Sequence, residues 1–321
     1  MDYFKNKKIL IIGDIMLDSY TYGNVYRVSP EAPVPILNLT KQDYKLGGSG
    51  NVALNIKALG GTPILISCVG DDNNGKIIIS KLKESNISSK FILKSNNRIT
   101  TDKLRFISNN HQLLRVDTEI VKNLDDCDNE KILSYLFKVI NNEKIDCILI
   151  QDYDKGLLSN SLIDHIIDIA NNRKIKIIVD PKHKNFNFYK NISLFKPNLK
   201  EFKEGLNLTE SDDNYLSLGS SILHNRGIEI VFVTLAEKGI FLSYKLHGQY
   251  INKIIPTIPR NIIDVSGAGD TCISIISLIL GDLNIEEIAN IVNIAGGLVC
   301  EEIGVVPINK EKLIIEINKI K

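Results

Sequence analysis

The chain has 321 residues, of which 44% are hydrophobic and 24% are charged, and its formal net charge is +1. This composition is typical of a globular protein with a large core, and the balanced charge argues against binding to nucleic acid or to an anionic membrane. The five cysteines form no C-x-x-C pair, and no apolar run approaches the roughly 18 residues that a membrane span needs. We therefore expect a cytoplasmic protein with reduced thiols.

Short apolar runs of strand length alternate with segments of helical period from the N-terminus onward. The strand-like runs are residues 8–13, 63–70, 145–152, 176–181 and 228–236. The helical segments include residues 50–60, 75–85 and 161–172. Such alternation predicts an α/β fold, with a mostly parallel sheet covered by helices on both faces.

Two segments interrupt this alternation, at about residues 20–45 and 90–118. They alternate apolar and polar residues as amphipathic strands do, and Pro30, Pro33 and Pro35 mark bends. We expect them to form a small inserted β-sheet that acts as a lid at the edge of the main sheet. Because no linker or repeat divides the chain, residues 1–321 are interpreted as one domain.

Polar residues follow the first strand and precede the first helix. Asp14 and Asp18 come after residues 8–13, and "GGSGN" at 47–51 joins a glycine turn to a helix. In open α/β sheets ligands bind beyond the carboxyl ends of the strands. Gly47 and Gly48 would let a ligand approach, and Asn51 with the two aspartates would suit sugar hydroxyls. The alternative is a glycine turn that only caps an amphipathic helix.

Further polar clusters follow later strands: "QDYDKG" with Asp152, "DPKHK", and "PNLKE". Each cluster could equally consist of helix caps and turn residues, but their shared position at strand ends favours a site. The G-x-x-x-x-G-K spacing at 70–76 has Ile77 where a phosphate-binding loop needs Ser or Thr. We reject that loop, and the absence of G-x-G-x-x-G after the first strand makes a dehydrogenase a poor hypothesis.

"SGAGD" at 266–270 opens a helix, so the N–H groups of Gly267, Ala268 and Gly269 have no partners within that helix. Such a turn forms an anion hole. Asp270 projects from the same turn and could take a proton from a hydroxyl held beside the anion. This arrangement favours phosphoryl transfer to an alcohol. The alternative is that Asp270 is only an N-terminal helix acid and the glycines a plain turn.

These motifs resemble those of the ribokinase-like, or PfkB, sugar kinases. "GGSGNVALNIKALGG" with "CVGDDNNG" is similar to the family's N-terminal signature, and "DVSGAGDT" to its C-terminal one. The resemblance extends from about residue 8 to 308. It implies a three-layer, doubly wound sheet and an ATP-dependent sugar kinase that uses Mg²⁺. Asp270 would be the catalytic base.

The resemblance also implies positions for the ligands. Asn198, Leu199, Lys200 and Glu201 would lie by the ATP phosphates, with Glu201 near magnesium. Thr234, Glu237 and Gly239 would border the nucleotide. Asp14, Asp18, Gly47, Gly48, Asn51 and Asp152 would form the sugar site. Asp264 and Ser266 match positions that bind a monovalent cation such as K⁺ in relatives.

Within the family, "RVSPEAPVP" and "QDYDKGLL" most resemble kinases of D-glycero-β-D-manno-heptose 7-phosphate. Those kinases phosphorylate the anomeric hydroxyl during synthesis of ADP-heptose for the lipopolysaccharide core. Bifunctional relatives carry a nucleotidyltransferase domain, so we expect that step on a separate protein here. The alternatives are another kinase of this fold, acting on ribose, fructose or a nucleoside, and an inactive sugar-binding regulator.

A sugar 7-phosphate needs cations, and guanidinium groups bind phosphate oxygens in bidentate fashion. The candidates are Arg27, Lys103 and Arg105 on the lid segments, whose alternative role is a solvated strand face. Leu104 stands where the resemblance leads us to expect a smaller polar residue. We also expect a homodimer through the lid, because a small sheet leaves exposed edges.

Overall fold

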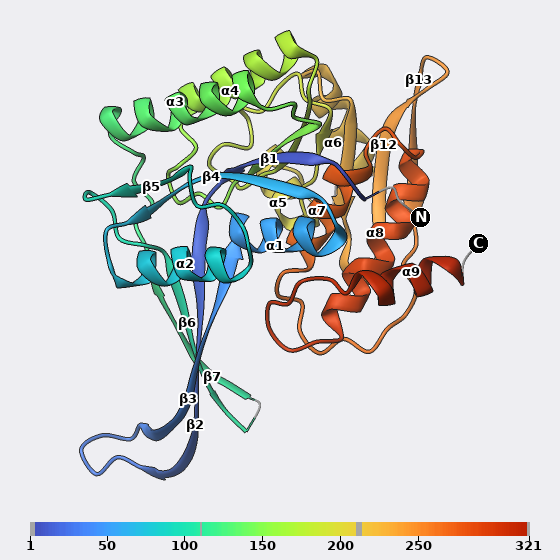
Figure 1. The fold of residues 1–321 in the computed structure, drawn as a ribbon. Helices are drawn as coiled ribbons and strands as arrows, with labels where there is room; N and C mark the ends of the chain where they lie inside the picture. The colour runs from blue at the N-terminus through green and yellow to red at the C-terminus, as the bar shows by residue number, and fades with distance from the viewer. Residues whose placement is uncertain (1–3, 110, 210–213, 320–321) are drawn as a thin grey trace.

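The computed structural model describes residues 4–109, 111–209 and 214–319. Among them, the main sheet has nine strands in the order β13-β12-β11-β10-β9-β8-β1-β4-β5 (Figure 1). The strands are β1 (Lys8–Gly13), β4 (Thr62–Gly70), β5 (Ile92–Ser95), β8 (Cys147–Gln151), β9 (Lys176–Asp180), β10 (Leu194–Phe195), β11 (Ile230–Thr234), β12 (Ile240–Leu246) and β13 (Gln249–Ile255). All pair in parallel except β12 and β13.

Helices cover both faces of this sheet, as the sequence predicts. One face carries α1 (Ser49–Leu59), α2 (Asn73–Glu84), α7 (Ala268–Ile279), α8 (Ile285–Cys300) and α9 (Lys310–Asn318). The other carries α3 (Asp126–Asn142), α4 (Asn160–Arg173), α5 (Leu199–Leu206) and α6 (Tyr215–Asn225). Alternate residues of β1 point into the two cores, Ile9 and Ile11 into one, Leu10 and Ile12 into the other. The period-2 alternation of a strand thus divides one apolar run between two cores.

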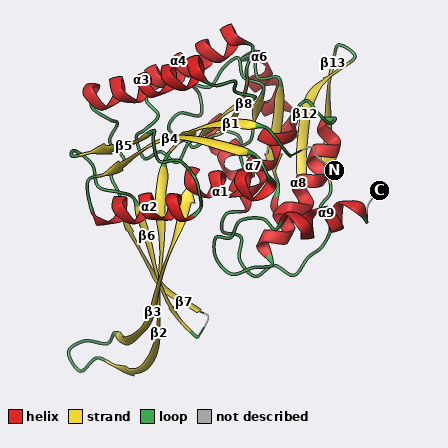
Figure 2. Ribbon diagram, viewed as in Figure 1, coloured by secondary structure: helices red, strands yellow, loops and turns green. Residues whose placement is uncertain are grey.

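The lid is a separate four-stranded sheet in the order β3-β2-β6-β7 that projects from the body (Figure 2). Its strands are β2 (Ile15–Val28), β3 (Pro35–Gly48), β6 (Asp102–Ser108) and β7 (His111–Thr118). β2 follows β1 almost directly, so the lid begins at the carboxyl end of the main sheet. Residue 110, inside the second predicted lid segment, lies outside the described residues.

Two features of the fold differ from the sequence-based interpretation. Ile92–Ser95, within the segment predicted as lid, instead pairs with β4 in the main sheet. The β12–β13 hairpin extends the parallel sheet with antiparallel strands, which the sequence pattern did not distinguish from parallel ones.

The rejected phosphate loop is a capped helix start: the Asp72 carboxylate accepts from the N–H of Gly75, 2.7 Å away. No helix in the described part of the chain is long and apolar enough to cross a membrane.

Candidate active site

The first turn of α7 lies at the carboxyl end of the parallel strands. Gly267 precedes the helix with φ of 82°, a conformation that favours glycine, and Asp270 lies in the first turn. The rest of α7 is buried among apolar side chains, which holds this turn in place. Gly269 is exposed, whereas only 4% of Asp270 is accessible. An anion could therefore approach the turn at Gly269 while the carboxylate beside it stays enclosed.

The two glycine motifs meet at this turn, although 219 residues separate them in sequence. The Asn51 side-chain amide donates to Oδ2 of Asp270 over 2.8 Å. A Cβ atom on Gly267 would lie only 2.9 Å from the same amide nitrogen. Gly267 is therefore needed both for its backbone conformation and for the space that Asn51 occupies. The structure thus brings together Asn51, Gly267 and Asp270, to which the sequence analysis assigned sugar-binding and catalytic roles.

Two residues at the end of β8 complete the surroundings of Asp270. Gln151 Nε2 donates to Oδ1 over 3.1 Å, and the Tyr153 hydroxyl donates to the same oxygen over 2.8 Å. Burial raises the pKa of Asp270 to about 6, although the hydrogen bonds from Asn51 and Tyr153 act in the opposite direction. The carboxylate is thus ionised at neutral pH and basic enough to accept a proton.

A buried ion pair stands beside the same turn. Lys196 Nζ lies 3.0 Å from Oδ2 of Asp180, and Gln151 also donates to that oxygen over 3.3 Å. Asp180 and other nearby acids raise the pKa of Lys196 against the effect of burial, so the ammonium stays charged. A Cβ atom on Gly269 would lie 3.8 Å from Lys196 Nζ. The first turn of α7, the expected anion hole, therefore has a positive charge next to Gly269.

The residues expected near ATP cluster at the ends of β10 and β11. Asn198 and Glu201 form a capping box at the start of α5, each side chain accepting from the other residue's N–H. Glu201 is also paired with Lys182, which follows β9. Lys200 is exposed and lies 3.7 Å from Glu204, and Leu199 is partly buried. The capping box holds the N-terminus of α5 next to β11, since Asn198 bridges to Thr234.

The other nucleotide candidates lie in the turn after β11. Gly239 has φ of 94°, and a Cβ atom there would collide with the carbonyl oxygen of Ile255. Glu237 is exposed in the short 3₁₀ helix Ala236–Lys238. Within the described residues no group of three or more His, Cys, Asp or Glu side chains could hold a metal ion. A magnesium ion here would depend on phosphate oxygens as well as one or two carboxylates, as Mg²⁺ usually does with nucleotides.

Among the expected sugar-binding residues, Asp18 lies at the base of the lid. Its Oδ1 accepts from Arg105, 2.6 Å away, and its Oδ2 occupies the space that a side chain on Gly47 would need. Gly48 has φ of 55° and precedes α1. These two glycines therefore allow Asp18 and the start of α1 to lie close together.

Asp14 and Asp152 have their acceptors filled within the chain. Asp14 accepts from the N–H groups of residues 153, 155 and 157 over 3.0 to 3.3 Å. Asp152 accepts from Tyr189, Asn185 and the N–H of Asp154. Burial raises the pKa of Asp152 to about 7. Both carboxylates shape the loop after β8, the loop that carries Tyr153.

The lid cations take different positions. Arg27 is exposed near the far end of β2, whereas Lys103 and Arg105 are partly buried where β6 meets the body. Lys103 Nζ lies 5.4 Å from the ring centre of Tyr153, and the Arg105 guanidinium lies 5.2 Å from that of Tyr20. Leu104 pairs with Ser19 and Val116, on the opposite face of the lid from Lys103 and Arg105.

The expected cation residues form a closed turn. Asp264 Oδ1 accepts from the N–H of Ser266 and Oδ2 from that of Gly304, each over 2.9 Å. These contacts hold the pKa of Asp264 below its ordinary value despite partial burial. An ionised carboxylate thus lies directly before the anion hole.

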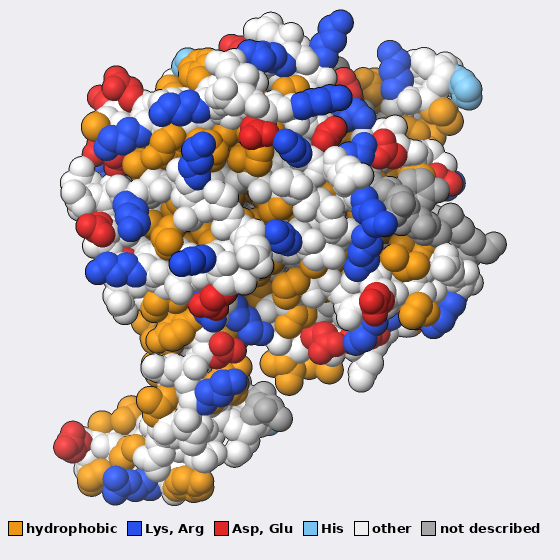
Figure 3. Space-filling view, in the orientation of Figure 1, with side chains coloured by type: hydrophobic (Ala, Val, Ile, Leu, Met, Phe, Trp, Pro, Cys, Tyr) orange, Lys and Arg blue, Asp and Glu red, His pale blue; other side chains and the backbone are white. Residues whose placement is uncertain are grey.

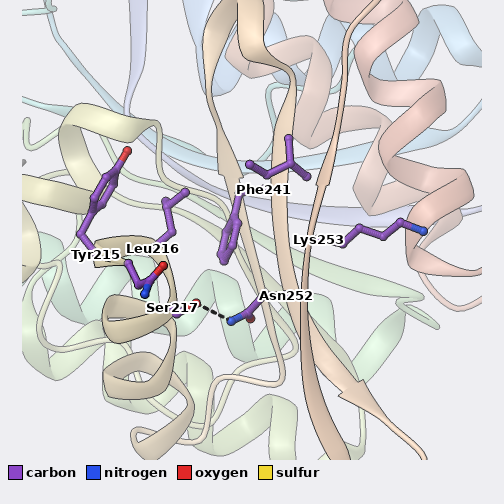
Figure 4. A pocket seen from close by; sticks show the side chains of 8 residues that line it. Tyr215, Leu216, Ser217, Phe241, Asn252 and Lys253 are labelled. Atoms are coloured by element: carbon purple, nitrogen blue, oxygen red, sulfur yellow. Dashed lines mark hydrogen bonds between the residues drawn. The ribbon is translucent and has the colours of Figure 1, made fainter. Parts of the chain in front are cut away.

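A separate hollow lies away from this turn. It measures about 380 Å³ and is lined by α6 and by β12 and β13, with Asn252 donating to Ser217 over 2.7 Å (Figure 4). Phe241 in its wall belongs to the core on the α6 face, whereas α7 packs on the opposite face. This hollow therefore lies apart from the candidate site.

Five residues of the site were not assigned from the sequence: Gln151, Tyr153, Asp180, Lys182 and Lys196. The first four belong to clusters recognised at strand ends, and Lys196 directly precedes "PNLKE". The available signal was that each follows a strand of the parallel sheet. Their distances to Asp270 and Gly269 depend on strand order, which the chain's local pattern does not contain.

Comparison with known proteins agrees with this geometry. A family profile described as pfkB family carbohydrate kinase matches residues 6–312. The bifunctional protein HldE of Aliarcobacter butzleri is 39% identical over 302 residues, which are 94% of this chain and 62% of that protein. HldE of Helicobacter pylori strain G27 is 36% identical over 98% of this chain and 67% of its own length. The chain thus spans roughly two thirds of these relatives or slightly less.

Solved structures share the fold at low sequence identity. Phosphofructokinase-2 from Escherichia coli in complex with potassium has a TM-score of 0.79 at 20% identity and covers 98% of both chains. Ribokinase from Arabidopsis thaliana complexed with ribose and ATP has a TM-score of 0.73 at 17% identity, over 97% of this chain and 98% of its own. The ribokinase-like fold expected from the motifs is confirmed, and the chain belongs to the pfkB family of carbohydrate kinases.

Proposed function

We propose that the chain transfers the γ-phosphoryl group of ATP to the anomeric hydroxyl of D-glycero-β-D-manno-heptose 7-phosphate. The observation that carries the proposal is the enclosed carboxylate of Asp270 beside the exposed Gly269 and the positive-φ Gly267 at the start of α7. The choice of sugar depends on the resemblance of "RVSPEAPVP" and "QDYDKGLL" to heptose 7-phosphate kinases. Similarity to the HldE proteins over 94% or more of the chain supports it.

In this reaction Asp270 takes the proton of the sugar hydroxyl as that oxygen attacks the γ-phosphorus. A bond forms between the oxygen and phosphorus, and the bond from phosphorus to the bridging oxygen of ATP breaks, which leaves ADP. The N–H groups of Gly267 to Gly269 and the Lys196 ammonium neutralise charge on the transferred group. Magnesium, bound to the nucleotide phosphates near Glu201, would supply further positive charge.

The lid offers cations for the phosphate already on the sugar. In register, Lys45, Asp18, Lys103 and Asp117 form one cross-strand row, and Asp43, Tyr20, Arg105 and Arg115 form the next. Directly paired residues share a face of a sheet, so these side chains make one charged face. That face meets the body, since the N–H of Val305 donates to Tyr20. We assign Lys103 and Arg105 to the phosphate, with Arg27 further out.

Steady-state kinetics with heptose 7-phosphate, ribose and fructose 6-phosphate tests the choice of sugar. We expect efficient turnover of the heptose phosphate and poor turnover of the two others. Efficient use of ribose with no turnover of heptose 7-phosphate would reject the heptose assignment and leave only a sugar kinase of this family. Added K⁺ in the same assay tests whether a monovalent cation binds at Asp264 and Ser266.

Since ATP and sugar phosphates are cytoplasmic metabolites, we place the reaction in the cytoplasm.

The other face of the lid favours a second copy of this chain as a partner. Leu104 and Phe106 pair there with Val116 and Leu114, and the latter two are exposed. Hydrophobic side chains are visible along the projecting lid in Figure 3. An exposed sheet of few strands with an apolar face needs covering. Light scattering at micromolar concentration should give twice the mass of one chain, and Leu114→Asp should halve it. A monomeric wild type would count against the dimer.

A further inference from the structure

The two oxygens of the Asp270 carboxylate have unequal surroundings. Oδ1 accepts from Gln151 over 3.1 Å and from Tyr153 over 2.8 Å, whereas Oδ2 accepts from Asn51 alone among the described residues. An ionised carboxylate offers about four acceptor positions, two on each oxygen. Oδ1 therefore has both positions filled, and Oδ2 keeps one position open. That open position is where a sugar hydroxyl can place its proton.

Tyr153, one of the two donors to Oδ1, is held from several elements at once. Its backbone N–H donates to Asp14 over 3.0 Å. A Cβ atom on Gly48 would lie 3.5 Å from its ring. Lys103 of the lid and Lys182 after β9 have their ammonium groups 5.4 and 5.3 Å from its ring centre. The Tyr153 ring thus contacts both Lys103 on the lid and Lys182, which pairs with Glu201.

We propose that Tyr153 is a positioning residue for the kinase reaction, an inference that rests on the proposed role of Asp270 as the base. By occupying Oδ1 it fixes the rotation of the carboxylate and reserves Oδ2 as the atom that receives the proton. Lys103 and Lys182 hold the ring on the lid side and the nucleotide side. The orientation of the base is thereby tied to the two segments that the substrates contact.

The phenol also sets the basicity of Asp270. A hydrogen bond to the charged form favours that form, so Tyr153 holds the pKa of Asp270 lower than burial alone would. Replacing Tyr153 by Phe removes only the hydroxyl and keeps the ring between the lysines. The carboxylate then becomes harder to ionise, and a given fraction of active enzyme requires a higher pH.

The test is the pH dependence of kcat/KM for the sugar in Tyr153→Phe. We expect the acidic limb to move upward by about one pH unit, the effect of losing one hydrogen bond to a charged group. Gln151→Met, which removes the other donor to Oδ1, should move the limb in the same direction. Because all variants are measured with one substrate, ionisation of the substrate cancels in the comparison.

The matched control is Tyr244→Phe, which removes a phenol that donates to Glu286 over 2.8 Å. Tyr244 pairs with Ile230 at the start of β11, at the opposite end of the sheet from Asp270. Its limb should stay at the wild-type position even if its melting temperature falls. An unmoved limb in both Tyr153→Phe and Gln151→Met, or an equal shift in Tyr244→Phe, would overturn the inference while leaving the kinase function intact. Full activity in Asp270→Asn would instead reject the proposed function itself.

Discussion

Charged and polar side chains are buried at the carboxyl end of the main sheet, whereas those on the outer strand of the lid are exposed. Around Asp270, charged and polar groups are enclosed and lie against one another: Gln151 is 1% exposed and Lys196 is 2% exposed. On the lid, β7 is exposed along its whole length, and its Arg115–Asp117 pair faces water. Enclosed dipoles need no rearrangement during reaction, whereas exposed charges adapt at little cost. The difference suggests that the body provides the chemistry and the lid provides the choice of sugar.

The assignment of the chemistry to the body would fail most clearly if Asp270 took no part in the reaction. We expect Asp270→Asn to lower kcat by ~10²–10⁴-fold, the range for loss of a general base. Nucleotide binding, measured by calorimetry, should be preserved because the N–H groups of the first turn remain. The control is Asp72→Asn, which alters a cap of α2 and should leave kcat within a factor of about two.

A second test concerns the contact between the two glycine motifs. Gly267→Ala places a methyl group 2.9 Å from the Asn51 amide and strains a backbone with φ of 82°. Misplacement of a base by a fraction of an ångström to 1 Å can cost on the order of 10²-fold, so we expect kcat to fall by about that factor.

Gly248→Ala is its matched control, because Gly248 has a similar φ of 87° and no other atom within 4 Å of the added methyl. It should cost about 1 kcal/mol of stability with unchanged kcat. Equal losses of kcat in the two variants would mean that backbone strain, and not the contact with Asn51, explains the first.

The sequence indicated the residues of the two glycine turns, but it did not indicate the contacts that depend on strand register. "GGSGN" and "SGAGD" each combine glycines with a polar residue at a helix start, which is a local signal, so Asn51 and Asp270 could be assigned. The pairing of Asp18 with Arg105 depends on the parallel register of β2 and β6, which lie more than 70 residues apart in sequence. Likewise Lys196 reaches Gly269 only because β10 lies where it does in the sheet. Local patterns contain no information on such register.

Substitutions on the lid should have a smaller effect, one confined to the KM for the sugar phosphate. Lys103→Ala should raise KM for heptose 7-phosphate by about 10-fold and leave KM for ATP unchanged, because a charged partner of the phosphate is lost. Steady-state kinetics with each substrate varied in turn measures both constants. A parallel rise in both KM values would show that Lys103 supports the fold of the site and not the sugar phosphate.

Arg115→Ala provides the weakest perturbation. Arg115 lies on the same charged face but is half exposed and paired with Asp117 at 2.9 Å. Exposed pairs contribute about 0–1 kcal/mol, so we expect less than about a threefold change in any kinetic constant. A larger change than that of Lys103→Ala would place the sugar phosphate further out on the lid, toward Arg27.

The pH dependence of kcat/KM in wild type and Asp270→Asn tests the central claim most directly. Burial raises the pKa of Asp270 to about 6, and only the ionised carboxylate can take the proton. Wild-type activity should therefore be constant above about pH 7 and fall about tenfold for each unit below 6. The residual activity of Asp270→Asn, measured with the same substrates, should lack that part of the fall. The same acidic limb in both proteins would contradict the assignment of Asp270 as the base.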